Sequence, residues 1–124
     1  MLLTVVKGIH KLLVKEFGGT DGLRSVEQLE SALARPYATF DGAELYPTVA
    51  DKAATLLESI LINHPFVDGN KRMGYALMRL MLLENGLDIL AAEREKYKLV
   101  IAVASGEAGL EDIKRWLAKY ITQY

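Results

Sequence analysis

Two apolar helical patterns meet at a nine-residue stretch that reads His64-Pro65-Phe66-Val67-Asp68-Gly69-Asn70-Lys71-Arg72. Before it, Thr48 can cap a helix whose apolar stripe ends at Leu61. After it, residues 73–83 are apolar on nearly every side, which is typical of a helix at the centre of a bundle. Because the stretch contains a proline and a glycine, it predicts a loop between two buried helices.

The rest of the chain is also dominated by helical periodicity. A stripe from Val5 to Leu13 predicts a first helix that Gly18-Gly19 ends. A capping-box pattern begins a short helix at Ser25, and Pro36 stops it. Two more helices are expected after Asn85-Gly86, with apolar positions at Tyr97, Val100, Ile101 and Ala104, and then at Leu110, Ile113, Trp116, Leu117, Tyr120 and Ile121. The sequence therefore predicts an all-α fold of about six helices, in one domain spanning residues 1–124.

One segment does not look helical. Asp41-Gly42 lies between two short runs that can form strands, and a two-residue hairpin turn needs positive φ at both central positions. The pattern predicts a small β-hairpin from Tyr37-Ala38-Thr39-Phe40 and Ala43-Glu44-Leu45-Tyr46. A plain surface loop is the alternative, because an isolated hairpin is only marginally stable.

Bulk properties exclude several classes of function. The formal net charge of −1 provides no overall field that would draw nucleic acid, so direct nucleic-acid binding is not expected. The lack of cysteine excludes disulfides, thiol nucleophiles and thiolate metal sites. The run from Met73 to Leu83 contains Arg79 and has about half the roughly 20 residues of a membrane span. Without a signal-peptide pattern either, we expect a cytoplasmic protein with no membrane partner.

The start of the second buried helix has the features of an anion site. Gly69 and Asn70 suit a loop-to-helix junction, where backbone N–H groups lack internal partners and the helix dipole favours negative charge. Lys71 and Arg72 add positive charge, and an arginine can hold phosphate oxygens with two parallel hydrogen bonds. A di- or triphosphate is therefore the expected ligand.

Two side chains of the stretch are candidates for chemistry. His64 can accept a proton near neutral pH, although a helix-end hydrogen bonder is the alternative role. Asp68 is the only acid of the stretch and is the candidate ligand of Mg²⁺, which typically takes one or two carboxylates plus phosphate oxygens. A helix N-cap is its alternative role. We expect Phe66 to anchor the loop in the core, and His10 to be structural.

These nine residues resemble the Fic/Doc signature, H-P-F-x-[DE]-G-N-[GK]-R, at every position. The likeness to Doc, the death-on-curing toxins, extends to residues 17–24, 29–36, 45–48 and 106–116. It implies a Fic/Doc-type helical bundle in which His64 is the general base for a target hydroxyl and Asp68 binds Mg²⁺. Gly69 and Asn70 would form the anion hole and Arg72 would contact phosphate, while the hairpin of residues 37–46 would be a flap that aligns the target chain by strand addition.

The resemblance also bears on the type of reaction. Lysine at the eighth position, here Lys71, is the Doc pattern, whereas Fic enzymes that transfer AMP usually have glycine there and a second arginine where this chain has Tyr75. The Doc branch implies a kinase toxin that transfers the γ-phosphate of ATP, with Mg²⁺, to a threonine of elongation factor Tu and so arrests translation. AMP transfer to a protein hydroxyl is one alternative, and a weakly catalytic module that binds its antitoxin is another.

The resemblance further suggests how the protein is controlled. Many Fic proteins have an inhibitory helix with the string [ST]-x-x-x-E-[GN], and this chain has none. We therefore expect an external partner, a Phd-type antitoxin whose disordered segment folds as a helix into a groove.

Overall fold

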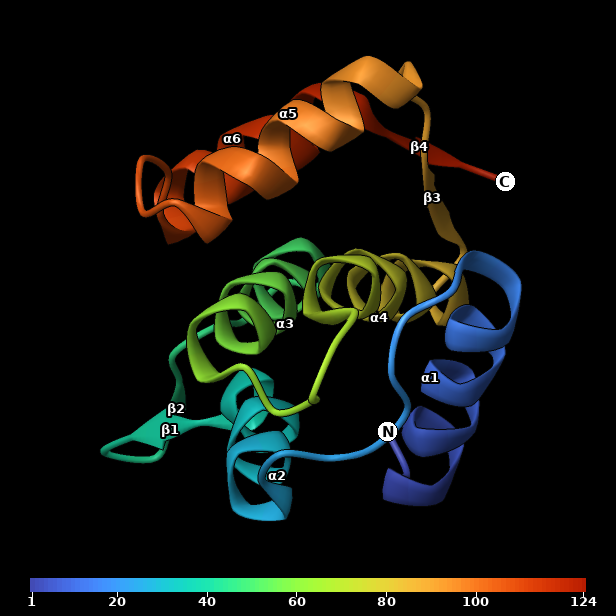
Figure 1. Ribbon diagram of the computed structural model, residues 1–124. Coiled ribbons are helices and arrows are strands. Elements are labelled where there is room, and N and C mark those ends of the chain that lie inside the picture. Colours follow the sequence, from blue (N-terminus) through green and yellow to red (C-terminus); the bar gives the residue numbers. More distant parts are fainter.

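The computed structural model describes residues 1–124 and arranges the helices in three layers (Figure 1). The middle layer consists of α3 (Val49–Asn63) and α4 (Asn70–Glu84). One side of it is covered by α1 (Leu3–Phe17) and α2 (Val26–Ala34), the other by α5 (Glu93–Ala104) and α6 (Leu110–Tyr120). The predicted all-α class and the six helices are confirmed. None of these helices combines the length and the apolar character that crossing a bilayer requires.

The core is centred on the contact between α3 and α4. Gly74 lets the two helices approach closely, since a Cβ on it would lie 3.1 Å from Leu57 Cδ1. On α4, Met73, Met78 and Met81 are buried, as expected for core packing. The prediction of a central helix after the motif is therefore confirmed.

Local signals place most helix ends correctly. Thr48 and Asp51 form a reciprocal capping box at the start of α3, and Ser25 Oγ accepts a hydrogen bond from the Gln28 backbone N–H at 3.1 Å at the start of α2. Gly18 ends α1 with φ of 87°, and α2 stops before the 3₁₀ turn η1 (Arg35–Tyr37), which contains Pro36.

The buried face of α5 differs from the prediction. Leu99, Val100 and Val103 are buried, whereas Tyr97 is 69% exposed and Ile101 is 36% exposed. The predicted helix is confirmed, but its apolar positions cover more than one face, and only Val100 of the four marked positions is buried. The apolar positions outside the core line a groove described below.

The predicted hairpin is present but shorter. Strands β1 (Thr39–Phe40) and β2 (Ala43–Glu44) pair antiparallel, and Asp41 and Gly42 have φ of 53° and 80°, as a two-residue turn requires. The prediction that the first strand starts at Tyr37 was wrong, because that residue closes the 3₁₀ turn after α2.

A second pair of strands was not predicted. Strand β3 (Leu87–Ile89) pairs antiparallel with β4 (Ile121–Gln123), so Ile121 leaves the last helix, on which it was expected. Each strand has three residues and its partner is distant in sequence, so neither shows a local periodic signal. Arg79 on α4 binds both carboxylate oxygens of Asp88 at 2.9 and 3.1 Å and ties β3 to the middle layer.

Candidate active site

His64 occupies the C-cap of α3 in a left-handed conformation, with φ of 49° and ψ of 55°. The side chain is exposed, and ring Nδ1 lies 3.3 Å from the Ile62 carbonyl oxygen. With the proton on Nδ1, the ring donates to that oxygen and Nε2 keeps a free lone pair. In that tautomer, Nε2 is the ring atom that faces no acceptor or donor of the chain.

The side chain of Asn70, the first residue of α4, holds the motif loop (residues 64–69) in shape. The Asn70 side chain accepts from the Phe66 N–H and donates to the Phe66 carbonyl, each at 3.0 Å. Both polar atoms of this amide are thus engaged in the loop itself. Asn70 was predicted to bind phosphate, and the group it presents to a ligand is its backbone N–H rather than its side chain.

Phe66 and His10 form a stacked pair beneath the loop. Phe66 is 1% exposed and its ring lies 4.1 Å from that of His10, with an interplanar angle of 13°. His10 Nε2 lies 2.7 Å from the Asp68 carbonyl oxygen, and Nδ1 lies 3.4 Å from Asp21 Oδ1. Phe66 thus has the burial expected of an anchor, and His10 supports the motif loop directly.

Asp68 points to the surface with both oxygens partly satisfied. Its Oδ2 accepts from the Thr20 N–H at 3.2 Å and its Oδ1 from the Gly69 N–H at 2.8 Å. These two bonds, with the charge of Arg72 contributing less, lower the pKa of Asp68 below the ordinary aspartate value. The structure does not use Asp68 as an N-cap, because Gly69 occupies that position with φ of 76°.

The first turn of α4 leaves its amides available. The first hydrogen bond of the helix runs from the Met73 N–H to the Gly69 carbonyl, so the N–H groups of residues 70–72 have no intrahelical partner. Lys71 and Arg72 are exposed beside them, and the Arg72 guanidinium lies 4.8 Å from the centre of the Phe17 ring. The predicted anion site therefore combines free amides, the positive end of a helix and two cations.

These groups line one groove of about 1040 Å³. Its floor comes from α4, and α1 and α5 supply its walls. The motif residues that line it are His64, Val67, Asp68, Gly69, Asn70, Lys71 and Arg72. The groove continues over Tyr75, whose hydroxyl is buried without a hydrogen-bond partner and whose pKa is raised by that burial. The structure thus brings the candidate base, carboxylate and anion site to one surface.

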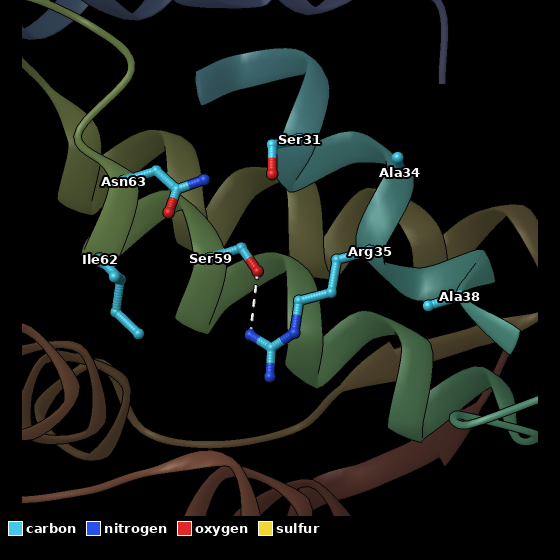
Figure 2. A pocket seen from close by; sticks show the side chains of 7 residues that line it. All are labelled: Ser31, Ala34, Arg35, Ala38, Ser59, Ile62 and Asn63. Carbon is cyan, nitrogen blue, oxygen red and sulfur yellow. Dashed lines mark hydrogen bonds between the residues drawn. The ribbon is translucent and has the colours of Figure 1, made fainter. Parts of the chain in front are cut away.

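The hairpin is fixed to α3 by ionic and polar contacts. Arg35 donates to Ser59 Oγ at 3.0 Å (Figure 2). It also pairs with Glu58 at 2.8 Å and reaches the Tyr46 hydroxyl at 3.4 Å. A pocket of about 520 Å³ lies between α2 and α3 at this point, and no motif residue lines it. All four strand residues are exposed, which leaves the hairpin free to meet another chain.

Several groups at the site escaped the sequence prediction. Thr20 and Arg24 reach the motif loop from the connection between α1 and α2, residues 18–25, and Lys96 and Tyr97 line the groove from α5. Two signals pointed to that connection: its glycine-rich composition, which indicates a loop with unusual backbone angles, and the family resemblance over residues 17–24.

Comparison with known proteins agrees with this geometry. Residues 2–82 match the sequence model of the Fic/DOC family. A protein named Toxin Doc, from Mycolicibacterium smegmatis, is 39% identical over 107 residues, which cover 84% of this chain and 82% of the relative.

Proposed function

The chain belongs to the Fic/DOC family, and we propose that it is the toxin of a toxin–antitoxin module and acts as a protein kinase. Its substrates would be ATP and a hydroxyl group of a translation factor, for which a threonine of elongation factor Tu is the candidate. Phosphorylation of that residue would arrest translation.

One arrangement carries this proposal: a proton acceptor and a phosphate site share the same groove. His64 lies at one end of the motif loop, and the free amides of residues 70–72 lie at the other. A target hydroxyl at His64 and a terminal phosphate at the amides are therefore presented to each other. Phosphoryl transfer depends mainly on such positioning and on charge stabilisation.

The proposed step transfers one phosphoryl group to the target and one proton to His64. The target oxygen bonds to the γ-phosphorus, the bond from that phosphorus to the bridging oxygen breaks, and ADP leaves. His64 Nε2 takes the hydroxyl proton. The N–H groups of residues 70–72 donate to the phosphate oxygens, and Lys71 and Arg72 offset their charge.

Asp68 fits a magnesium ion that is bound mainly through the nucleotide. It is an exposed carboxylate with a lowered pKa, and no cluster of three or more His, Cys, Asp or Glu side chains occurs in the structure. Mg²⁺ accepts this kind of site, because one carboxylate with phosphate oxygens and water satisfies its octahedral geometry. Bound there, it would neutralise phosphate charge.

Two positions favour γ-phosphoryl transfer over AMP transfer. Lys71 adds a side chain and a charge at the anion site, and Tyr75 stands one helical turn beyond Arg72 in the same groove. A partly buried phenol cannot replace a second arginine as a phosphate clamp, because it carries no positive charge. This pair supports binding of ATP with its γ-phosphate toward His64.

The apolar walls of the groove suit the proposed antitoxin. Ile9 and Leu13 from α1 line the groove together with Ile101 and Ala104 from α5, and Tyr97, which also lines it, is exposed. A helical segment with one apolar face would bury these side chains. We propose a Phd-type antitoxin for this role, and expression of the chain alone should arrest growth while co-expression of the antitoxin restores it.

A label-transfer assay tests the reaction. Purified protein, Mg²⁺ and bacterial lysate are incubated with ATP that is labelled at the α- or the γ-phosphate, with His64→Asn as the control. Label from the γ-position alone in one protein band supports the kinase, and the size of that band nominates the target. Label from the α-position means nucleotidyl transfer and overturns the proposed orientation.

A further inference from the structure

The backbone of His64 is in a conformation that needs support. A left-handed φ is unfavourable for a residue with a Cβ, and His64 and Asp41 are the two non-glycine residues that adopt it. Asp41 sits in a two-residue turn, where this conformation is ordinary. His64 has no such turn, and it follows the last residue of α3, where the helical carbonyls have lost their partners.

Arg24 binds three consecutive carbonyl groups at this point. Its Nε donates to the His64 oxygen at 2.6 Å, and its Nη2 donates to the Asn63 oxygen. Its backbone N–H donates to the Pro65 oxygen at 2.7 Å. The peptide groups on both sides of His64 are therefore fixed by one residue from the α1–α2 connection.

The guanidinium is suited to this task by its shape. Its N–H groups form a rigid planar fork, so two of them can reach adjacent carbonyls at the same time. Its positive charge lies at the C-terminal end of α3, where the helix dipole favours it. A lysine at position 24 would keep the charge but could not hold the two carbonyls in a fixed relative orientation.

Neighbouring contacts keep Arg24 in place. Leu23 forms a β-bridge with Phe66, and the Ser25 N–H donates to the Pro65 carbonyl at 3.1 Å. On the α3 side, Asn63 Nδ2 donates to the Gln28 carbonyl at 3.0 Å. The residues that flank Arg24 and the end of α3 that it binds are thus both fixed. The fold therefore sets the direction of the His64 Cα–Cβ bond.

We propose that Arg24 is a positioning residue that holds the His64 ring toward the groove. The expected effect of Arg24 on the rate rests on the proposed function, whereas its effect on the position of the His64 ring can be measured without any activity. Because Arg24 touches neither the amides of residues 70–72 nor Lys71 and Arg72, its loss should affect the chemical step and spare nucleotide binding.

The kinetic test compares Arg24→Ala and Arg24→Lys with Thr48→Ala. The last variant removes the N-cap at the opposite end of α3 and is the control for a general loss of stability. We expect both Arg24 variants to lower kcat for γ-phosphate transfer about 10- to 100-fold with KM for ATP changed less than about 2-fold. Added methylguanidinium should partly restore Arg24→Ala. A kcat equal to that of Thr48→Ala, or a change confined to KM, would overturn the inference.

A second measurement is independent of catalysis. The chain has two histidines, so the ring signals in a proton–carbon NMR spectrum are assigned by comparison with His64→Asn. In Arg24→Ala, the His64 signals should shift and broaden while those of buried His10 stay in place. Unchanged His64 signals would contradict the positioning role, whether or not the wild type is active. Absence of transfer by the wild type would instead count against the proposed function alone.

Discussion

Gly19 lies so close to Asp68 that a Cβ on Gly19 would meet Asp68 Oδ2 at 2.7 Å. Gly19 also has φ of 106°, which side chains rarely tolerate. Its lack of a side chain allows the next amide, that of Thr20, to donate to the same oxygen at 3.2 Å. The α1–α2 connection therefore helps to set both the direction and the pKa of the motif carboxylate.

Gly19→Ala should damage the fold and the proposed metal site together. We expect a loss of about 1–3 kcal/mol in the free energy of unfolding, because the new Cβ forces a strained backbone and displaces Asp68. The concentration of Mg²⁺ that supports half-maximal transfer should rise. Urea unfolding and a magnesium titration measure the two effects.

Gly8→Ala is the matched control for that variant. Gly8 lies on the exposed face of α1 and a Cβ there meets nothing within 4 Å, so alanine should leave activity unchanged and raise stability by about 0.5–1 kcal/mol. Equal behaviour of the two variants would show that the approach of Gly19 to Asp68 has no consequence.

The Arg79–Asp88 pair should give the fold a measurable dependence on acid. The guanidinium of Arg79 and the Ile89 N–H lower the pKa of Asp88 to about 2. In the unfolded chain the pKa of an aspartate is about 3.9. A carboxyl group whose pKa is lower in the folded chain stabilises the fold at any pH above that unfolded pKa. This stabilisation is lost as the pH falls through the folded pKa.

Asp88→Asn tests this ion pair. Because the pair is partly exposed, we expect the variant to lose up to about 1 kcal/mol at pH 7. The difference from the wild type should shrink between about pH 4 and about 2 in denaturant unfolding. A difference that stays constant down to the lower pH would mean that the carboxylate charge is not its source.

His64→Asn should remove transfer without unfolding the protein. Asparagine tolerates the left-handed conformation that His64 adopts, so this substitution adds less strain than alanine would. We expect transfer of the γ-label to fall about 10²- to 10⁴-fold, the usual contribution of a general base. The unfolding midpoint serves as the check on the fold, and wild-type rates in the variant would assign the proton transfer to another group.

Lys71→Gly tests which way the nucleotide lies. We expect weaker transfer from γ-labelled ATP and new transfer from α-labelled ATP, because the anion site gains room and loses a charge. Lys71→Ala is the comparison, since it removes the charge but keeps the helix propensity of the first turn of α4. If both variants phosphorylate at the wild-type rate, Lys71 does not determine orientation.

The sequence was most informative where a local pattern was sufficient. Local residues predicted the start of α3 at Thr48, the end of α1 at Gly18 and the hairpin turn at Asp41-Gly42. The motif predicted the helix junction that carries His64 and the candidate anion site. Contacts between distant segments left no such pattern. The pairing of β3 with β4 and the reach of Thr20 and Arg24 to the motif loop depend on the packed fold, and no periodicity reports them.

Thr39→Pro tests whether the hairpin aligns a target chain. The Leu45 N–H donates to the Ala38 carbonyl at 3.0 Å, so alternation along the ladder turns the N–H and carbonyl of Thr39 outward. Proline removes this outward donor and leaves the hydrogen bonds within the hairpin intact. Ala38 already has the extended conformation that a following proline requires, with ψ of 143°. We expect KM for the protein target to rise about 10-fold, the loss of about one hydrogen bond, with KM for ATP unchanged. Thr39→Ala keeps the N–H and should behave as the wild type. Normal phosphorylation by the proline variant would show that the target does not add a strand at Thr39.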